Sequence, residues 1–535
     1  MANEGTMKTF MKGAVLLTMA GFIVKLLSAV YRVPFQNLVG DQGFYIYQQV
    51  YPFVGIFSVW TSYGFAVAVS KLLADSDRQD HPAILRLSVG FIAAVSLAVF
   101  LVLFFGAEGL AGWMGDRQLA PLLQIAALAV LLMAPIAVMK GHFQSQNHMQ
   151  PVAYAQVMEQ AIRVSVILLG AWFVVMAGYS LYAAGSMAIL GAAIGELAAV
   201  GLLVYYFRAS YSKTTKPAKG IAAWPIIKKM MAISLSISMS SLILLFFQLV
   251  DSFSVFRLLT ETGMDRLAAM EQKGVYDRGQ PLVQFGILMA TSLSLAIVPL
   301  VAQMAKTPSG RPAQAYAQLA FRVSFLFAFA SAVGLSLVMP YVNEMLFETR
   351  EESGALIIFS WQIVWMALLL VLTSLLYGLG KVKVPAWLLA GGVAVKIMGN
   401  WLLIPKWEVT GAALAGNLGL AFIVFGLLLY FKKVWPIRLA PNRYYGWILT
   451  GSAAMAAVVL SWSLLADLVL FAGFESRLSA VFIALTAVVL GAAVFLVLIA
   501  RSRIITEKEW FIVPFGRKLA GLQLKLNARK KGDRI

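Results

Sequence analysis

Residues 141–163 read GHFQSQNHMQPVAYAQVMEQAIR. The stretch predicts a short polar loop, a turn at Pro151, and then a long apolar helix that carries Glu159 and Arg163. Two opposite charges therefore fall inside a hydrophobic span, where each costs at least ~2.5–3.5 kcal/mol and usually faces a partner or a water-filled cavity. This pattern is typical of a functional site at membrane depth.

The whole chain is as apolar as this stretch. Of its 535 residues, 61% are hydrophobic, 13% are charged and none is cysteine, whereas a soluble protein carries about 25% charged residues. His81, His142 and His148 fall in predicted loops and lack the spacing of a metal site. We therefore expect no disulfide, no metal site and no cofactor.

Apolar runs long enough to cross ~30 Å of hydrocarbon occur along the entire sequence. They cover residues 10–31, 44–69, 83–106, 119–140, 152–175, 181–207, 225–250, 281–303, 316–340, 354–378, 384–404, 409–431, 444–468 and 476–500. These runs predict an all-α polytopic membrane protein with about 14 transmembrane helices.

The basic residues indicate the orientation of these helices. Most Lys and Arg residues fall in alternate loops, which predicts that both termini are cytoplasmic. The net charge of +19 is then mostly a topology signal, with anionic lipid of the inner leaflet as its counterion and no role for nucleic acid.

Helices 1–6 and 7–12 look like two copies of one unit. Residues 61–67 (TSYGFAV) resemble residues 291–297 (TSLSLAI), and Pro151 and Pro385 each open a helix. Substrate in such designs binds between the two halves, near the midplane. The predicted domains are an N-terminal six-helix bundle (1–207), a basic cytoplasmic linker (208–229), a C-terminal six-helix bundle (230–431), helices 13 and 14 (432–500) and a basic cytoplasmic tail (501–535).

Two segments outside the spans carry many charges. Residues 251–280 mix both signs, and most of this outer loop is expected to be a solvated cap. The basic tail has Trp510, Phe511 and Phe515 near its start, which predicts a segment lying on the inner leaflet.

Several charges lie within the predicted spans. Glu159 and Arg163 are spaced i, i+4 in the favourable order, so they either neutralise each other and fix their helix or serve a cavity. Lys25 has no acidic residue one turn away, which favours a cavity role over snorkelling. Arg322 lies near a helix end, where snorkelling is favoured.

The remaining embedded polar groups add to a cationic excess. Lys396 lies near the middle of helix 11 with Asn400 one turn on, and Glu196 could pair with a cation or take up a proton. An excess of Lys and Arg suits an anionic ligand such as a phosphate or diphosphate. The sequence has no P-loop, no GxSxG elbow and no dinucleotide fingerprint, so we expect a transporter or flippase rather than an enzyme.

Four stretches resemble a known family. They are GHFQ, MQP, QVMEQ and Arg163 within residues 141–163, KLL and YRVP within residues 25–34, YDRGQPLVQ at residues 276–284, and GAALA at residues 411–415. Together they resemble the stage V sporulation protein B-like group of the MOP superfamily, polysaccharide and lipid-linked oligosaccharide flippases related to the lipid II flippase MurJ. The similarity spans roughly residues 8–431.

The resemblance implies two six-helix bundles in a V, in the bacterial cytoplasmic membrane. It implies export, by alternating access, of an undecaprenyl-diphosphate-linked sugar, either peptidoglycan lipid II or another cell-envelope polysaccharide unit. Lys25 and Arg278 are implied to meet the diphosphate or its sugar. A helix 2 arginine found in some relatives falls near Ile56 here, which leaves the glycan open, and helix 11 has no acidic group to hold sodium.

The expected site combines these residues. The substrate-binding set is Lys25, Arg32, Arg163, Arg278 and Lys396, and the cavity or coupling set is Glu159, Glu196, Asp251 and Asn400. The expected partners are a lipid-linked glycan diphosphate and membrane lipid, with the chain as a monomer. Two alternatives remain: a MATE-type cation or multidrug antiporter, which would need carboxylates facing the drug, and a non-transporting scaffold in envelope or spore assembly.

Overall fold

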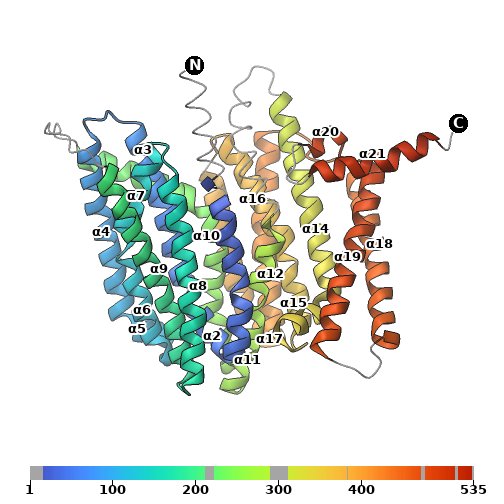
Figure 1. Cartoon of the computed structure of the whole chain (residues 1–535), viewed down its shortest axis with the longest axis horizontal. Helices are drawn as coiled ribbons and strands as arrows, with labels where there is room; N and C mark the ends of the chain where they lie inside the picture. Colours follow the sequence, from blue (N-terminus) through green and yellow to red (C-terminus); the bar gives the residue numbers. More distant parts are fainter. Residues whose placement is uncertain are drawn as a thin grey trace. The chain divides into compact units, whose positions relative to one another are not determined.

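Helices form nearly all of the described structure (Figure 1). The computed structural model describes residues 16–17, 19–210, 222–288, 311–381, 383–470, 476–511 and 516–532, and no strand occurs in these ranges. The contacts between residues divide the chain into two units, Met1–Asp277 and Arg278–Ile535, called unit 1 and unit 2 below.

Unit 1 begins with a helix at residues 19–30 that continues into α2. Its other elements follow in chain order: α2 (Arg32–Val59), the π-helix η1 (Trp60–Phe65), α3 (Ala66–Ala74), α4 (His81–Phe105), α5 (Ala107–Trp113), η2 (Arg117–Leu119), α6 (Ala120–Val130), α7 (Met133–Ser145), α8 (Gln150–Met176), α9 (Leu181–Ser210), α10 (Ala223–Glu261) and α11 (Arg266–Asp277).

Unit 2 holds the remaining helices. They are α12 (Gly279–Gly286), α14 (Arg311–Phe347), α15 (Ser353–Ser360), α16 (Gln362–Gly378), α17 (Lys383–Val434), α18 (Asn442–Leu465), the π-helix η3 (Ala466–Leu470), α19 (Arg477–Ser502), α20 (Glu507–Trp510) and α21 (Gly516–Gly532). The units divide after α11, whereas the sequence placed a linker at residues 208–229. The predicted six-helix repeats therefore stay a prediction, and residues 291–297 of the proposed repeat lie outside the described residues.

The described residues contain 11 helices long and apolar enough to cross a membrane. Lys383–Val434 contains two predicted spans, and Met19–Ala74 contains the span 44–69 and residues 19–31 of the span 10–31. The predicted span at residues 281–303 lies mostly outside the described residues. The all-α, multi-pass fold is confirmed, and the count of fourteen stays a prediction.

Each double-length helix contains a break with a local cause. In α2, Gly40 has φ 68°, a left-handed conformation that costs glycine little. In α17, Pro405 cannot donate a backbone hydrogen bond, and Glu408 adopts φ 48°. The second break lets the two halves of α17 fold against each other.

Small residues let the helices of unit 1 approach closely. Helices α8 and α9 pack side by side (Figure 1). A Cβ at Gly195 would lie 2.6 Å from the Glu159 carbonyl oxygen, so only glycine permits this contact. Packing of this kind is the usual basis of helix association in membranes.

The predicted solvated cap at residues 251–280 is wrong for most of its length. Helix α10 continues to Glu261, and α11 packs against α2, with Lys273 and Asp277 buried. A Cβ at Gly274 would collide with the Asp41 carbonyl oxygen, which explains the close contact. The charges at the two ends of this segment are therefore buried, whereas those of its middle stay exposed: Asp251, Lys273, Asp277 and Arg278 are buried, and Glu261, Asp265, Arg266 and Glu271 are exposed.

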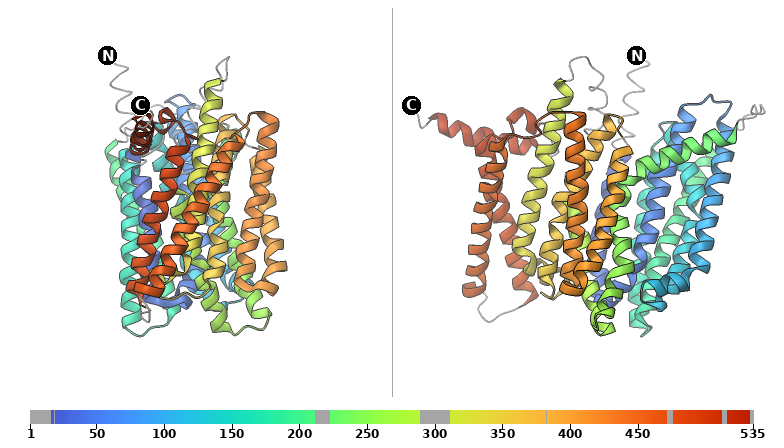
Figure 2. Two further views of the ribbon diagram at one scale, coloured as in Figure 1. Left: turned by 90° about the vertical axis from the view of Figure 1, so that its right-hand side faces the viewer. Right: turned by 180° about the vertical axis from the view of Figure 1, so that it is seen from behind.

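The start of the predicted interfacial tail packs against the protein, and its position on the inner leaflet stays a prediction. Trp510 is only 2% exposed and packs edge-on against Phe327, with ring centroids 6.5 Å apart. Arg322 does not snorkel, because it binds the Glu509 carboxylate and donates to the Ile504 carbonyl oxygen at 3.1 Å. Figure 2 shows α20 and α21 at the end of α19. The contacts of Glu509 with Arg322 and of Trp510 with Phe327 hold this segment against α14.

We expect Trp510→Ala to destabilise the protein far more than Phe511→Ala. Removing the buried ring leaves a cavity that costs about 3–5 kcal/mol, whereas Phe511 is 60% exposed. Thermal unfolding of the purified chain in mild detergent measures the difference. Equal unfolding midpoints for the two variants would mean that the tail lies on the membrane surface instead.

Candidate functional site

Four charged side chains from three helices form a buried network in unit 1. Arg163 of α8 donates from Nη2 to Glu159 Oε1 at 2.9 Å. The same Arg163 nitrogen lies 3.6 Å from Glu196 Oε1 of α9, and Lys140 Nζ of α7 lies 3.6 Å from Glu159 Oε2. The predicted pair of Glu159 and Arg163 is thus part of a larger cluster that also holds Glu196.

Lys140 was missed by the sequence analysis, which ended an apolar run at this residue and did not count it among the embedded charges. Helix α7 continues through Ser145, so Lys140 and His142 are buried rather than solvated. Lys140 also donates from Nζ to the Ser62 hydroxyl of η1 at 3.0 Å. A Cβ at Gly141 would lie 2.7 Å from the Ala66 carbonyl oxygen, so this glycine brings Lys140 close to η1 and α3.

The network is electrically balanced. Its two cations and two carboxylates neutralise each other, which offsets part of the desolvation that buried charges require. This arrangement favours a role in fixing α7, α8 and α9. Among the fully buried side-chain atoms that the structure describes in this network, Arg163 Nε has no hydrogen-bond partner, and contact of Arg163 with substrate stays a prediction.

Arg32, unlike the charges of this network, is a buried cation with no ion pair among the described residues. The sequence placed it in an outer loop, but it begins α2 and its exposed fraction is 0%. None of its three side-chain nitrogens finds a hydrogen-bond partner in the described part of the chain. Its guanidinium lies 4.7 Å from the centre of the Tyr51 ring, and beside it the Tyr31 and Tyr47 hydroxyls share a hydrogen bond of 2.6 Å.

Lys25 and Arg32 share one helix face. The backbone hydrogen bonds Tyr31 N to Leu27 O and Phe35 N to Tyr31 O, of 3.1 and 3.0 Å, keep the helix continuous between them. Residues seven positions apart in an α-helix lie on nearly the same face, ~10 Å apart along the axis. Lys25 is exposed, and no ion pair or hydrogen bond of its side chain occurs among the described residues.

An acidic group of α11, Asp277, lies within electrostatic reach of Arg32. Asp251 is buried and accepts a hydrogen bond of 2.8 Å from the Tyr276 hydroxyl, while Lys273 donates to Asp277 at 2.6 Å. Burial raises the pKa of the Asp277 carboxyl to about 6, and Lys273 and, more weakly, Arg32 lower it. Arg32 therefore has a carboxyl within electrostatic reach but not within hydrogen-bond distance.

In unit 2, the break in α17 brings a backbone carbonyl oxygen within hydrogen-bond distance of Lys396. It lies in the first half of the helix and donates from Nζ to the Ala412 carbonyl oxygen of the second half at 2.9 Å. Gly399 packs against Ala415, where a Cβ would come within 2.8 Å. The GAALA stretch thus supplies the small residues that let the halves meet, and both Lys396 and Asn400 are buried.

Arg278 is also buried and partnered within unit 2. It donates from Nη1 to Asn343 Oδ1 at 2.6 Å and lies over the Phe347 ring, 4.8 Å from its centre. Asn343 in turn donates to the Glu351 carbonyl oxygen at 2.8 Å. The substrate roles of Arg278 and Lys396 stay predictions. In the ranges that the structure describes, His, Cys, Asp and Glu side chains form no group able to hold a metal ion.

Similarity to known proteins identifies the family of this chain. The family described as polysaccharide biosynthesis protein matches residues 10–305. This chain belongs to that family. The predicted relationship to stage V sporulation protein B and MurJ within the MOP superfamily is confirmed by the relatives below.

Three relatives come from Bacillus subtilis (strain 168). The uncharacterized membrane protein YabM is 39% identical over 95% of this chain and 96% of its own length. Stage V sporulation protein B is 28% identical over 65% of this chain and 68% of its own length. The lipid II flippase MurJ is 22% identical over 91% of this chain and 94% of its own length.

Solved structures share the fold of this polysaccharide biosynthesis family member. The lipid II flippase MurJ in an inward closed conformation has a TM-score of 0.68 at 16% identity, covering 90% of this chain and 98% of that one. An inward-facing MATE family transporter of the MOP superfamily has a TM-score of 0.59 at 14% identity, covering 79% and 98%. At these identities the structures show a common fold only.

We expect Lys140→Gln to lower the thermal unfolding midpoint of this family member much more than Lys229→Gln. Removing one member of a buried ion network costs about 3 kcal/mol, whereas the half-exposed pair of Lys229 and Asp75, 3.0 Å apart, is worth about 0–1 kcal/mol. Adding Glu196→Gln to Lys140→Gln restores the charge balance and recovers part of the loss. Indistinguishable midpoints for the two lysine variants would show that the network contributes little.

Proposed function

We propose that this chain is a flippase that moves an undecaprenyl-diphosphate-linked sugar precursor from the inner to the outer leaflet by alternating access. Membership in a polysaccharide biosynthesis family and the likeness to a lipid II flippase support a lipid-linked cargo. We place the chain in the bacterial cytoplasmic membrane as a monomer with both termini in the cytoplasm, and we assign it no covalent chemistry.

The observation that carries this proposal is the buried guanidinium of Arg32, which has no ion pair among the described residues and is surrounded by tyrosines. A buried cation without a hydrogen-bond partner is costly, so it persists where a ligand or a function needs it. Phosphate and diphosphate oxygens match the planar fork of arginine better than any neutral ligand does. Lys25 stands exposed on the same helix face and would meet the diphosphate first.

Arg32 has an exposed fraction of 0%, so a ligand reaches it only after the surrounding helices move. That requirement fits alternating access, in which the site is closed to one side before it opens to the other. In this scheme the balanced network of Lys140, Glu159, Arg163 and Glu196 keeps α7 to α9 together during the movement. Arg278 and Lys396 are proposed to engage the cargo from unit 2, and the isoprenoid tail stays in the lipid.

The alternatives fit the charges less well. A cation antiporter needs a carboxylate that faces its drug, but Glu159 and Glu196 both lie within 4 Å of cations of this chain. A scaffold has no need for a buried cation without a partner. Asp251, Glu196 and Asn400 remain proposed coupling residues, because the geometry identifies no coupling ion.

We expect Lys25→Gln combined with Arg32→Gln to weaken binding of lipid II about tenfold or more, because each lost charge-assisted hydrogen bond is worth about 1.5–3 kcal/mol. Native mass spectrometry of the full chain in mild detergent measures binding, with tetraphenylphosphonium offered in competition. Reconstitution in liposomes then measures how fast lipid II becomes accessible from the other side.

The matched control is Lys71→Gln combined with Arg78→Gln, which removes the same charge from exposed positions of unit 1. It should keep binding and flipping close to the wild-type level. The proposal fails if both double variants bind lipid II equally well. Preferential binding of tetraphenylphosphonium that Glu159→Gln or Glu196→Gln weakens would instead support the antiporter.

A further inference from the structure

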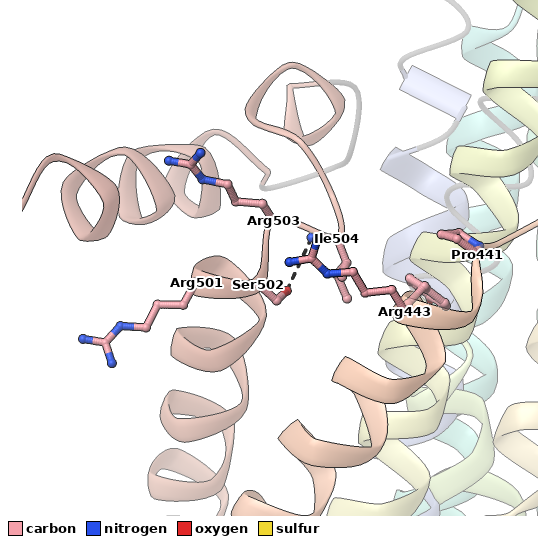
Figure 3. Close-up of a pocket in the computed structure, with 7 residues that line it drawn as sticks. Pro441, Arg443, Arg501, Ser502, Arg503 and Ile504 are labelled. Atoms are coloured by element: carbon pink, nitrogen blue, oxygen red, sulfur yellow. Dashed lines mark hydrogen bonds between the residues drawn. The ribbon is translucent and has the colours of Figure 1, made fainter. Parts of the chain in front are cut away.

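The arginine-lined cavity of unit 2 does not gather its charges around one ligand. It measures about 550 Å³ and lies where α18 begins and α19 ends (Figure 3). The Arg501 and Arg503 side chains extend away from Arg443, so the three guanidinium groups do not meet. A buried carboxylate of unit 1, by contrast, gathers donors from several helices.

This carboxylate belongs to Asp116, which precedes η2 and has an exposed fraction of 0%. Its Oδ2 atom accepts from the Tyr182 hydroxyl of α9 at 2.6 Å and from the Tyr45 hydroxyl of α2 at 3.4 Å. Its Oδ1 atom accepts from the Gln118 backbone nitrogen at 3.1 Å and from Arg266 Nη2 of α11 at 2.5 Å. One carboxylate thus joins α2, α9 and α11.

The two sides of the Asp116 and Arg266 ion pair have different surroundings. The buried carboxylate keeps three other donors when Arg266 leaves it, so it stays hydrogen-bonded in its place. The Arg266 side chain is 48% exposed, so water solvates it once the pair breaks. Opening this pair therefore leaves no buried charge without a partner, whereas opening the network of α7 to α9 does.

Helix α11 covers the part of α2 that begins at Arg32. The two helices pack against each other (Figure 1), and their backbones meet where a Cβ at Gly274 would collide with the Asp41 carbonyl oxygen. Residues 273–277 of α11 are all buried. Asp277, at the end of α11, lies within electrostatic reach of Arg32. We therefore call α11 the lid.

The chain on both sides of the lid suits a movable element. Gly263, in the turn between α10 and α11, has φ 94°, a left-handed conformation that glycine adopts without strain. At the other end the chain passes from Asp277 directly into Arg278 of unit 2. A movement between the two units therefore acts on the lid through the chain itself.

We propose that Asp116 is a positioning residue whose ion pair with Arg266 holds the lid over Arg32 and breaks when the site opens to the outside. The inference rests on the proposed role of Arg32 in cargo binding and on the predicted topology, which places α11 on the outer side. Cargo then leaves outward only after the lid releases α2. Closing the lid restores the ion pair and buries Arg32 again.

The absence of cysteine from the sequence makes the position of the lid measurable. Gln36→Cys introduces a single thiol one helical turn from Arg32, at a position that is 2% exposed. A membrane-impermeant maleimide labels this thiol in the full chain, and right-side-out and inverted membrane vesicles present the two sides separately. We expect Arg266→Gln to raise the labelling rate from the outer side about tenfold, because a charge-assisted hydrogen bond of the closed state is lost. The rate from the inner side should not rise.

The matched control is Arg257→Gln in the same Gln36→Cys background. It breaks the 2.7 Å ion pair with Glu261, and its side chain is 43% exposed, against 48% for Arg266. This control should label at the background rate, and Arg266→Lys, which keeps the charge, should also label slowly. Equal rates in Arg266→Gln and Arg257→Gln overturn the proposal. Faster labelling from both sides also overturns it, because Arg266 would then only stabilise the fold.

A second experiment locks the lid instead of releasing it. Gln42 Nε2 of α2 donates to Glu271 Oε1 of α11 at 2.9 Å, so a short bis-methanethiosulfonate should bridge Gln42→Cys and Glu271→Cys. We expect the bridged chain to stop moving lipid II in liposomes and reduction of the bridge to restore movement. Undiminished movement in the bridged chain overturns the lid. If even the wild type does not move lipid II, the proposed function fails, whereas the labelling rates still decide the role of Asp116.

Discussion

The structure depends on one constraint: a charge that leaves water must find another partner. In unit 1, Lys140, Glu159, Arg163 and Glu196 meet this constraint together, and their ion pairs join three helices. The glycines beside them follow from the same requirement, because Gly141 and Gly195 let backbones come close enough for short polar contacts. In unit 2 the broken helix α17 satisfies Lys396 in another way, by turning a backbone carbonyl oxygen toward it.

Much of this could be predicted from the sequence, because the relevant signals are local. The length and hydropathy of each apolar run identify a membrane helix without knowledge of its neighbours. The spacing of Glu159 and Arg163 predicts their contact because residues four positions apart meet on one helix face. Lys140 was missed because α7 stays helical through the polar stretch 141–145, which resembles a loop in composition.

The other errors came from contacts between distant residues. Trp510 and its basic neighbours have the composition of a membrane-surface segment, and only the contact of Glu509 with Arg322 shows that a protein surface binds them. The mixed charges of residues 251–280 look solvated in sequence, yet Lys273 and Asp277 neutralise each other in a buried helix. Arg32 looked like a loop residue because its cover comes from tyrosines whose positions depend on the fold.

Arg32 and the balanced network make opposite use of buried charge, and the proposed flippase mechanism uses both. If Arg32 were ion-paired in the empty protein, an anionic cargo would have to break that pair, and most of the binding free energy would be lost. The Tyr51 ring stabilises the guanidinium by only about 0.5–2 kcal/mol, less than a paired phosphate provides. In the proposed mechanism, leaving this cation to an aromatic neighbour keeps it available to the cargo, while the network in α7 to α9 keeps the surrounding helices in place.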